Sequence, residues 1–445
     1  MLLRCLTLIA CALLAGAVVA ADKPGPNDWP QWRGQNRDGK SPETGLLKSW
    51  PKEGPALKWT AKDLGTGFSS PSIAAGKIFA MGNREGKDGV FALQEADGKE
   101  LWFTEIDDTR NDIRKGKNPG PQNIGPASTP TYADGKVYAV SNKNGVVAKL
   151  DATTGKIEWQ KSYVKDFGAG TPSWGFSDSV LVDGDAVICA PSGSKGAIAA
   201  LKVSNGDVKW ATQVKNIGGG AGYCSPVKTT VGGVPIYIVT LGQQGGTIGV
   251  HAGTGNLLWQ FTKNAYGGVA QIPTPIVGED RVFISTGYGG GSALLKLVPK
   301  GNDTVEAEEV WSAKGDPLNH HGNMILLDGK VYFGHGNNNG TPVCYDFKTG
   351  KEVWHEPKPP QGASGSAAYS YADGMLYIRY QNRLMTLVKP SPEGHKIVSQ
   401  FMLPEPNVSG QYGSQSWAHP VIANGKMYLR DQNLLYCYNV KATTN

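Results

Sequence analysis

Charged side chains are scarce in this sequence. Asp, Glu, Lys and Arg make up 18% of the 445 residues, whereas about 25% is usual in globular proteins. The 44 cations exceed the 38 anions by only 6, and no dense run of Lys and Arg occurs. Because nucleic-acid binding depends on a concentrated basic surface, we expect no nucleic-acid partner. The 40% hydrophobic content excludes a disordered chain.

Long apolar runs are missing beyond the N-terminus, and no later stretch reaches the about 18 residues of a membrane-spanning segment. The single early run, Leu6 to Val19, follows Arg4 and leads into small residues. This order is typical of a cleavable export signal, so residues 1–21 are predicted to be a signal peptide. Cys11 lies inside the run, which leaves too short an apolar segment for a lipoprotein signal. We therefore expect a periplasmic or secreted protein without a lipid anchor.

Cysteine spacing argues against several cofactors. Two of the six cysteines lie in the signal peptide, and the other four are far apart, at Cys189, Cys224, Cys344 and Cys437. No pair has the CxxC spacing of zinc ligands or the CxxCH motif of covalent haem. We expect no metal cluster and no haem. A disulfide between Cys189 and Cys224 is possible in an oxidising compartment, and two buried thiols are the favoured alternative.

Glycine and proline are abundant, and this excludes long helices. The chain has 60 Gly and 28 Pro, which is about 20% of its residues against a usual value of roughly 12%. Each Gly costs about 1 kcal/mol and each Pro about 3 kcal/mol inside a helix. The composition favours many short strands joined by tight turns.

Tryptophan recurs along the chain at intervals of about 43 to 57 residues. A period near this length, with strand and turn signals, is typical of a β-propeller blade. We interpret each tryptophan as a structural residue that ends the fourth strand of a blade and packs against the next blade. The repeating positions are Trp59, Trp102, Trp159, Trp210, Trp259, Trp311 and Trp354, with Phe401 in the eighth place.

Two turn motifs recur within this period. Asp-Gly and Asn-Gly favour two-residue hairpin turns with positive φ. They occur at Asp134-Gly135, Asp183-Gly184, Asp328-Gly329, Asp373-Gly374 and Asn424-Gly425. A second turn, before the fourth strand, places a glycine at Gly98, Gly155, Gly206, Gly255 and Gly350. The repeats predict an all-β, eight-bladed propeller of four-stranded antiparallel blades.

The last blade is short of one strand, because no Asp-Gly-x-x-Trp unit follows the segment that ends at Val440. The stretch from Pro55 to Trp59 has the sequence of a fourth strand but precedes the first blade. We therefore expect this N-terminal strand to complete blade 8 and close the ring, which removes open sheet edges. The predicted organisation is an N-terminal extension over residues 22–54 and one propeller domain over residues 55–441.

The unit around Asp151, Ala-x-x-Asp-x-x-Thr-Gly-Lys-x-x-Trp, resembles the tryptophan-docking repeat of propellers related to pyrroloquinoline quinone (PQQ) enzymes. That superfamily includes quinoprotein alcohol dehydrogenases and BamB-type scaffolds. The opening Asp28-Trp-Pro-Gln-Trp-Arg-Gly is similar to a branch of exported PQQ-like repeat proteins of planctomycete type. The resemblance covers about residues 28 to 441 and implies the fold, while function has to be argued from a site.

The resemblance leaves two functions open. A PQQ-dependent alcohol or sugar dehydrogenase would need PQQ, a calcium ion and an Asp base, and the related alcohol dehydrogenases carry two adjacent cysteines. This sequence has no adjacent cysteines and no long insertions between blades. We therefore expect a non-enzymatic binding or scaffold protein of the cell envelope, a monomer with a protein or small-molecule partner, and keep the PQQ and calcium dehydrogenase as the alternative.

A ligand site is expected at one mouth of the central channel. The first strand of each blade lines that channel, so the residues that enter these strands ring its mouth. They are aromatic, amide and imidazole side chains with almost no charge, which is typical of a ligand pocket. The alternative is that they only fill the channel. The candidates are Trp174, Tyr223, Gln271, His320, His321, Gln415 and Trp417.

Blade 6 holds a cluster of histidines. If Asp328-Gly329 forms a two-residue turn and pairing continues outward without interruption, His321 faces Gly336 and Gly322 faces His335. His320, His321 and His335 would then converge on one rim. Since neighbouring strand positions point to opposite faces, all three are not expected to bind one metal ion. Hydrogen bonds to a ligand or to backbone are the preferred interpretation.

Overall fold

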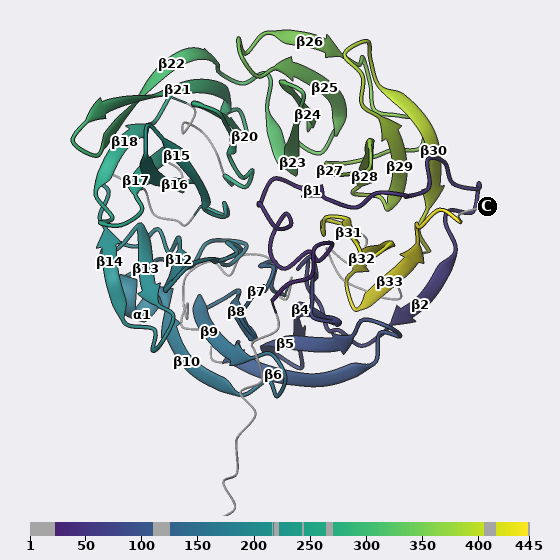
Figure 1. Cartoon of the computed structure of the whole chain (residues 1–445), viewed down its shortest axis with the longest axis horizontal. Coiled ribbons are helices and arrows are strands. Elements are labelled where there is room, and N and C mark those ends of the chain that lie inside the picture. Colours follow the sequence, from purple (N-terminus) through teal and green to yellow (C-terminus); the bar gives the residue numbers. More distant parts are fainter. Residues whose placement is uncertain are drawn as a thin grey trace, which may run out of the picture.

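The computed structural model describes residues 23–109, 125–215, 217, 222–242, 244–263, 270–404 and 415–443. Eight antiparallel sheets lie around a central axis, as Figure 1 shows. The one helix within these ranges is the short α1 (Tyr163–Phe167). The predicted all-β, eight-bladed propeller is confirmed. The predicted signal peptide, residues 1–21, lies outside the described residues and stays a prediction.

Each of blades 1 to 4 is a four-stranded sheet whose strands follow one another in sequence. Blade 1 contains β3 (Ser72–Ala74), β4 (Lys77–Arg84), β5 (Lys87–Gln94) and β6 (Glu100–Asp108). Blade 2 contains β7 (Thr131–Ala133), β8 (Lys136–Val140), β9 (Val146–Asp151) and β10 (Ile157–Ser162). Blade 3 contains β11 (Leu181–Asp183), β12 (Ala186–Cys189), β13 (Ile198–Lys202) and β14 (Val208–Thr212). Blade 4 contains β15 (Val227–Val231), β16 (Val234–Thr240), β17 (Thr247–His251) and β18 (Leu257–Phe261).

Blades 5 to 7 repeat this order. Blade 5 contains β19 (Ile276–Gly278), β20 (Arg281–Thr286), β21 (Gly291–Gly301) and β22 (Thr304–Ala313). Blade 6 contains β23 (Asn319–Leu327), β24 (Lys330–His335), β25 (Thr341–Asp346) and β26 (Glu352–His355). Blade 7 contains β27 (Ala367–Ala372), β28 (Met375–Tyr380), β29 (Leu384–Lys389) and β30 (Lys396–Met402), with β1 (Lys40–Ser41) added in parallel beside β27.

Blade 8 is completed by the N-terminal strand, as the sequence predicts. Its sheet contains β31 (Val421–Ala423), β32 (Lys426–Asp431), β33 (Leu434–Asn439) and β2 (Leu57–Ala61). In β2, Trp59 is paired antiparallel with Cys437 of β33. In Figure 1 the dark β2 lies beside the yellow β33, so the two ends of the chain share one blade.

The predicted turns form with one shift in register. Asp134, Asp328, Asp373 and Asn424 all have φ between 45° and 54° and are each followed by a glycine of positive φ. In blade 3, however, Asp183 pairs with Ala186, so the two turn residues are Gly184 and Asp185. The shift has a steric reason, because Gly184, with φ of 58°, takes the left-handed position that glycine tolerates best.

The second turn brings a glycine of one blade under the tryptophan of the preceding blade. A Cβ atom added to Gly155 would lie 2.7 Å from the Trp102 ring, and one added to Gly98 would lie 2.6 Å from the Trp59 ring. Gly206 and Gly255 lie in the same way under Trp159 and Trp210. Phe401 of blade 7 packs on Gly54 of the extension. Glycine is needed here both for its positive φ and for the close approach of the indole.

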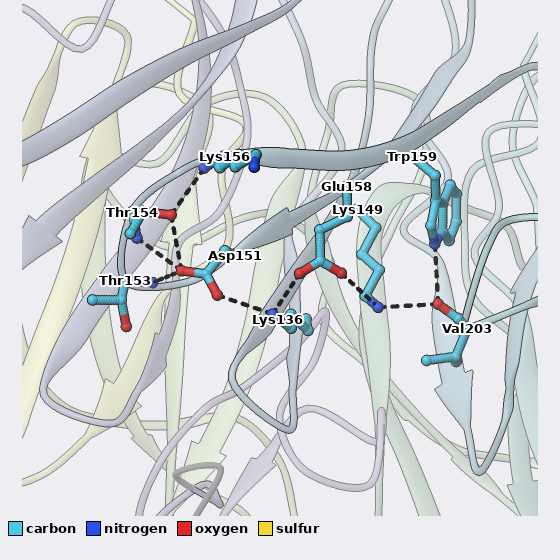
Figure 2. A network of polar contacts seen from close by, with 9 residues as sticks. All are labelled: Lys136, Lys149, Asp151, Thr153, Thr154, Lys156, Glu158, Trp159 and Val203. Carbon is cyan, nitrogen blue, oxygen red and sulfur yellow. Dashed lines mark hydrogen bonds and ion pairs between the residues drawn. The ribbon is translucent and has the colours of Figure 1, made fainter. Parts of the chain in front are cut away.

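Figure 2 shows the polar network around the second turn of blade 2 and around Trp159, which ends that blade. Oδ1 of Asp151 accepts hydrogen bonds from the backbone N–H groups of residues 153 and 154, and Oδ2 lies 2.9 Å from Nζ of Lys136. Lys136 also pairs with Glu158 at 2.5 Å. The Trp159 indole N–H donates to the Val203 carbonyl of blade 3 at 3.0 Å. One acidic side chain thus fixes the turn, and the indole joins two blades.

The hydrophobic core is divided into clusters that lie between neighbouring blades. One cluster joins Phe79 of blade 1 to Tyr132 and Val137 of blade 2, and another joins Val421 of blade 8 to Ile73 of blade 1. The four cysteines described are buried in this core as free thiols. Burial raises the pKa of Cys224 to about 12, which keeps its thiol protonated.

Candidate functional site

The N-terminal extension occupies the central channel at the end that carries the hairpin turns. It enters at the face that carries the hairpin turns, because Asp28 accepts from the Asn424 side chain at 3.0 Å and Glu43 accepts from the Gly425 N–H at 2.7 Å. Between these points Trp29 exchanges two backbone hydrogen bonds with Ile73 of blade 1. In Figure 1 the dark purple trace crosses the middle of the ring. The extension, rather than the rim side chains, occupies the channel at this level.

Two buried arginines hold the extension in place. Arg33 donates to the Met324 carbonyl of blade 6 at 2.5 Å. Arg37 donates to the Ser179 and Val180 carbonyls of blade 3 at 2.7 and 3.1 Å. Burial lowers the pKa of Arg33 to about 10 and that of Arg37 to about 9, so both remain charged at neutral pH. Charged donors that bind carbonyls of blades 3 and 6 make the extension a fixed part of the channel.

A cavity of about 310 Å³ lies between the extension and the other mouth of the channel. Trp32, at the tip of the extension, lines its inner end and donates its indole N–H to Oγ1 of Thr274 at 3.0 Å. Among the described residues that line this cavity there is no Asp, Glu, Lys or Arg. Its walls include the aromatic side chains Phe68, Trp174, Tyr223, Tyr288 and Trp417. We refer to this space as the central cavity.

The structure brings five of the seven candidate residues together at the central cavity, namely Trp174, Tyr223, His320, His321 and Trp417. The other two do not line it. Gln271 is buried between the lining residues Ala270 and Ile272, and its backbone carbonyl accepts the backbone N–H of Tyr223 at 2.9 Å. The backbone carbonyl of Gln415 accepts a hydrogen bond from the Gln432 side-chain amide at 3.3 Å.

Sequence reasoning missed Trp32, Tyr288 and His419, which all line the central cavity. Trp32 belongs to the extension, whose sequence has no repeat that would place it in the channel. Tyr288 has φ of 54°, an uncommon conformation for a bulky residue that is often associated with functional sites. The usable signal for Tyr288 was its place within a glycine-rich stretch, where backbone of positive φ is expected.

The predicted register of the blade 6 histidines is wrong. Leu327 pairs with Lys330 as expected and Met324 pairs with Phe333, but His335 then pairs with Asn319. Asn323 has φ of 56°, and the segment that contains His320 and His321 bulges out of the ladder. Such bulges redirect side chains at functional sites.

The three histidines therefore do not converge. His335 packs on His355, with 5.0 Å between ring centroids, and its Nδ1 lies 3.4 Å from Asp316. His320 and His321 remain neighbours at 4.5 Å and line the central cavity. The bulge is the physical reason, because it separates two residues that a regular ladder would hold close to His335. Within the described part of the chain, no three His, Cys, Asp or Glu side chains are placed to hold a metal ion.

The imidazoles of the central cavity are neutral hydrogen-bonding groups. Nδ1 of His320 lies 2.8 Å from Oγ of Ser366, and Nε2 lies 2.9 Å from the Tyr288 hydroxyl. Burial lowers the pKa of His320 to about 4 and that of His419 to about 3. The pKa of His321 is well below its usual value because of burial and the nearby His320 and His419. The described lining of the cavity therefore presents uncharged donors and acceptors at neutral pH.

Neither PQQ nor its calcium ion fits the described walls of the central cavity. PQQ carries three carboxylates, which need cationic or multiple N–H partners when they are buried. Calcium needs six to eight oxygen ligands with carboxylates among them. The described lining supplies no ionised side chain of either sign. The aromatic faces of the lining would suit a planar ring, but its described residues have no charged group to pair with the carboxylates of this cofactor.

Comparison with known proteins relates the chain to both branches of the superfamily. It is 24% identical over 317 residues to the polyvinylalcohol dehydrogenase of Pseudomonas sp, which covers 63% of this chain and 48% of that protein. It is 25% identical over 303 residues to the outer membrane protein assembly factor BamB of Moranella endobia (strain PCIT), which covers 64% of this chain and 66% of that protein. The match thus spans less than two thirds of either relative.

A solved structure of an alcohol dehydrogenase shares the propeller fold. The quinohemoprotein alcohol dehydrogenase of Comamonas testosteroni superposes with a TM-score of 0.64 at 13% identity, over 94% of this chain and 81% of that one. The chain is thus a BamB-like and PQQ dehydrogenase-like propeller. None of the described helices is long and apolar enough to cross a membrane. The family model described as "Outer membrane protein assembly factor BamB" matches residues 19–216 and 87–356, and because these ranges span more than half of the 445 residues, the chain belongs to this PQQ-like repeat family.

Proposed function

We propose that this protein is a non-enzymatic binding protein of the cell envelope, exported by residues 1–21, whose ligand is a small molecule held in the central cavity. The relative from Moranella endobia is an outer membrane protein assembly factor, which supports an envelope location. The proposed signal peptide has the order of charge and apolar residues that export requires. A monomer is expected, because the ring is closed by its own N-terminal strand.

The observation that carries the proposal is the state of His321. Its two ring nitrogens are buried, and neither makes a hydrogen bond of normal geometry with a described residue, although the Gln381 amide lies nearby. A buried polar group without a partner costs about 1 to 3 kcal/mol. Since His321 lines the central cavity and has at most the Gln381 side chain as a described hydrogen-bond partner, a ligand in the cavity can bind its imidazole.

A second candidate function is the PQQ-dependent dehydrogenase. The similarity to a polyvinylalcohol dehydrogenase favours it, as does a cavity with several aromatic faces at the channel mouth. The described walls oppose it, since their residues offer neither a calcium ligand set nor a carboxylate base for the alcohol proton. A protein-docking role on the outer surface is compatible with the binding function, and its partner would be an envelope protein.

The test separates a ligand site from a packed channel. Trp174 is only partly buried, whereas Trp159 is 8% exposed and lies between blades. Trp174→Ala should leave the melting temperature within a few degrees of the parent protein, and Trp159→Ala should lower stability by about 3 to 5 kcal/mol. Equal losses for Trp174→Ala and Trp159→Ala would mean that the cavity walls are core and not a site.

The enzyme alternative is tested on the same preparation. The protein is incubated with PQQ and Ca²⁺, and dye reduction is followed with simple alcohols, sugars and polyvinyl alcohol. We expect no reduction above the rate of free PQQ and no change in tryptophan fluorescence. Turnover that His321→Leu abolishes would favour the quinoprotein function over a binding protein.

A further inference from the structure

The central cavity combines aromatic faces with uncharged hydrogen-bonding groups. Its described walls carry the rings of Trp32, Phe68, Trp174, Tyr223, Tyr288 and Trp417. Between them lie serine hydroxyls, the Asn338 amide and the imidazoles of His320, His321 and His419. Aromatic side chains give a large apolar contact area, and their hydroxyl or N–H groups add directed hydrogen bonds. Such walls suit a ligand that has apolar faces and polar edges.

The charge around the central cavity disfavours a cation. Burial is the largest cause of the lowered pKa of His419, and the positive charges of the buried Arg33 and Arg379 lower it further, so their potential reaches the inner end of the cavity. Asp431 pairs with Arg379 at 3.3 Å, and none of the described wall residues is a carboxylate. A quaternary ammonium ion, which aromatic cages otherwise bind, would meet repulsion here.

An anion is disfavoured for a different reason. The guanidinium of Arg33 donates to three backbone carbonyls, those of Arg37, Asp38 and Met324. Arg379 donates to the carbonyl of Ala418 and to Oγ of Ser416. Both guanidinium groups therefore make several hydrogen bonds inside the protein, and neither is among the described residues that line the cavity. A carboxylate or phosphate would lose its hydration without a charged donor in contact among the described lining residues.

Hydrogen-bond donors of the walls are available to a neutral ligand. Oγ of Ser70 accepts the backbone N–H of His419 at 2.8 Å, and Oγ of Ser225 accepts the backbone N–H of Ser179 at 2.9 Å. The Tyr223 hydroxyl accepts the backbone N–H of Trp174 at 3.3 Å. No described residue accepts the hydroxyl proton of Ser70, Ser225 or Tyr223, so each is free to donate. The neutral imidazole of His321 offers one donor and one acceptor in addition.

We propose, on the basis of the binding function proposed above, that the occupant of the central cavity is a neutral saccharide of one or two rings. A sugar ring presents C–H faces to aromatic side chains and hydroxyls, which both donate and accept, around its edge. The cavity volume of about 310 Å³ lies at the lower end of the range for small-ligand sites, which fits one or two rings. Trp32, Trp174 and Trp417 supply the stacking faces, and His321 and the hydroxyls fix the orientation.

The experiment uses the full mature chain and tryptophan fluorescence titration, with three tryptophans in the cavity as reporters. Glucose, galactose, mannose, N-acetylglucosamine, maltose and cellobiose are the neutral probes. Glucose 6-phosphate and PQQ are the anionic probes, and choline is the cationic probe. We expect saturable binding of at least one neutral sugar, with a matching rise in melting temperature. His321→Leu and Ser225→Ala should each weaken binding at least tenfold, whereas His355→Leu, outside the cavity, should leave it unchanged.

The outcomes separate this inference from the proposed function. Binding of choline, glucose 6-phosphate or PQQ in the cavity without binding of any neutral sugar would overturn the saccharide inference. It would leave the proposed binding function standing. Absence of binding by every probe up to 50 mM would overturn both. Sugar binding that His321→Leu and Ser225→Ala leave unchanged would place the sugar elsewhere and overturn the inference. Folding of each variant is checked by its melting temperature before titration.

Discussion

The indole of Trp32 meets the imidazole of His419 edge to face, with 4.7 Å between ring centroids. Trp32 belongs to the N-terminal extension and His419 leads into the first strand of the last blade, 387 positions later in the chain. The contact lies at the inner end of the central cavity, where both side chains form part of the wall. The extension is therefore both a support of the channel and a part of the candidate site.

Replacement of Trp32 tests this double role. Trp32→Ala removes the hydrogen bond to Thr274 and the contact with His419, so we expect a loss of about 1 to 3 kcal/mol, measured by chemical unfolding. Trp32→Phe keeps an aromatic face and should lose about 1 kcal/mol. A loss in Trp32→Ala as large as that of Trp159→Ala would show that Trp32 is core rather than wall.

The docking turns give a matched pair of glycines. Gly155 and Gly184 have φ of 72° and 58°, and an added Cβ would meet Trp102 and Thr104 at Gly155 but nothing within 4 Å at Gly184. Alanine at either position costs about 1 to 2 kcal/mol in a left-handed conformation. Gly155→Ala should cost at least about 2 kcal/mol more, because the Trp102 ring has to move away. Equal melting temperatures for the two variants would contradict the close indole contact.

Closure of the ring depends on a buried arginine. Arg430 of blade 8 donates to the carbonyls of Met81 in blade 1 and of Leu64, which follows β2. Burial lowers its pKa to about 9. Arg430→Met would leave these carbonyls without donors, so we expect a loss of about 2 to 4 kcal/mol. Arg84→Met, which removes a partly exposed pair with Glu100 and a hydrogen bond to the Asp63 carbonyl, should cost only about 1 kcal/mol. Chemical unfolding of both variants compares them.

Stability should fall between pH 7 and pH 5. Burial lowers the pKa of His320 and His395 to about 4 and that of His419 to about 3. The pKa of histidine in the unfolded chain is about 6.5, so the unfolded chain binds more protons than the folded one in this interval. Between pH 7 and pH 5 each of these histidines therefore lowers the free energy of unfolding by about 2 kcal/mol. Burial raises the pKa of Asp88 and Asp178 to about 6. The folded chain takes up these protons between pH 7 and pH 5, so each carboxyl raises the free energy of unfolding by about 1.4 kcal/mol over this interval. The histidines outweigh the carboxyls.

The pH prediction is checked by thermal unfolding in matched buffers at pH 7 and pH 5. The parent protein should melt at a lower temperature at pH 5. His395→Asn, which changes a residue outside the central cavity, should reduce the difference between the two values. An unchanged or higher melting temperature at pH 5 would contradict the lowered histidine pKa values.

Local sequence signals predicted most of the ring. Gly155 and Trp159 recur with their neighbours in one repeat, and both the turn conformation and the strand that follows depend on residues close in sequence. The closing strand was predicted because Trp59 carries the same local pattern without a blade of its own. Such features need no knowledge of distant parts of the chain.

The candidate site was predicted only in part, because its remaining members depend on distant contacts. Arg33 and Arg37 bind backbone carbonyls, which every residue possesses, so no partner side chain marks the path of the extension. The bulge at His320 depends on one left-handed residue, Asn323, and asparagine tolerates that conformation in many places without forming it. A pattern that assumes a regular ladder misplaces every residue beyond such a bulge.

The use of β2 to complete blade 8 sets an order of events during synthesis. The strand Leu57–Ala61 leaves the ribosome before any blade exists, whereas its partner Leu434–Asn439 is made only after the seven other blades. While those seven blades are being made, this strand has a free edge. The nascent chain must therefore delay closure, and the ring becomes one cooperative unit only after Leu434–Asn439 has left the ribosome.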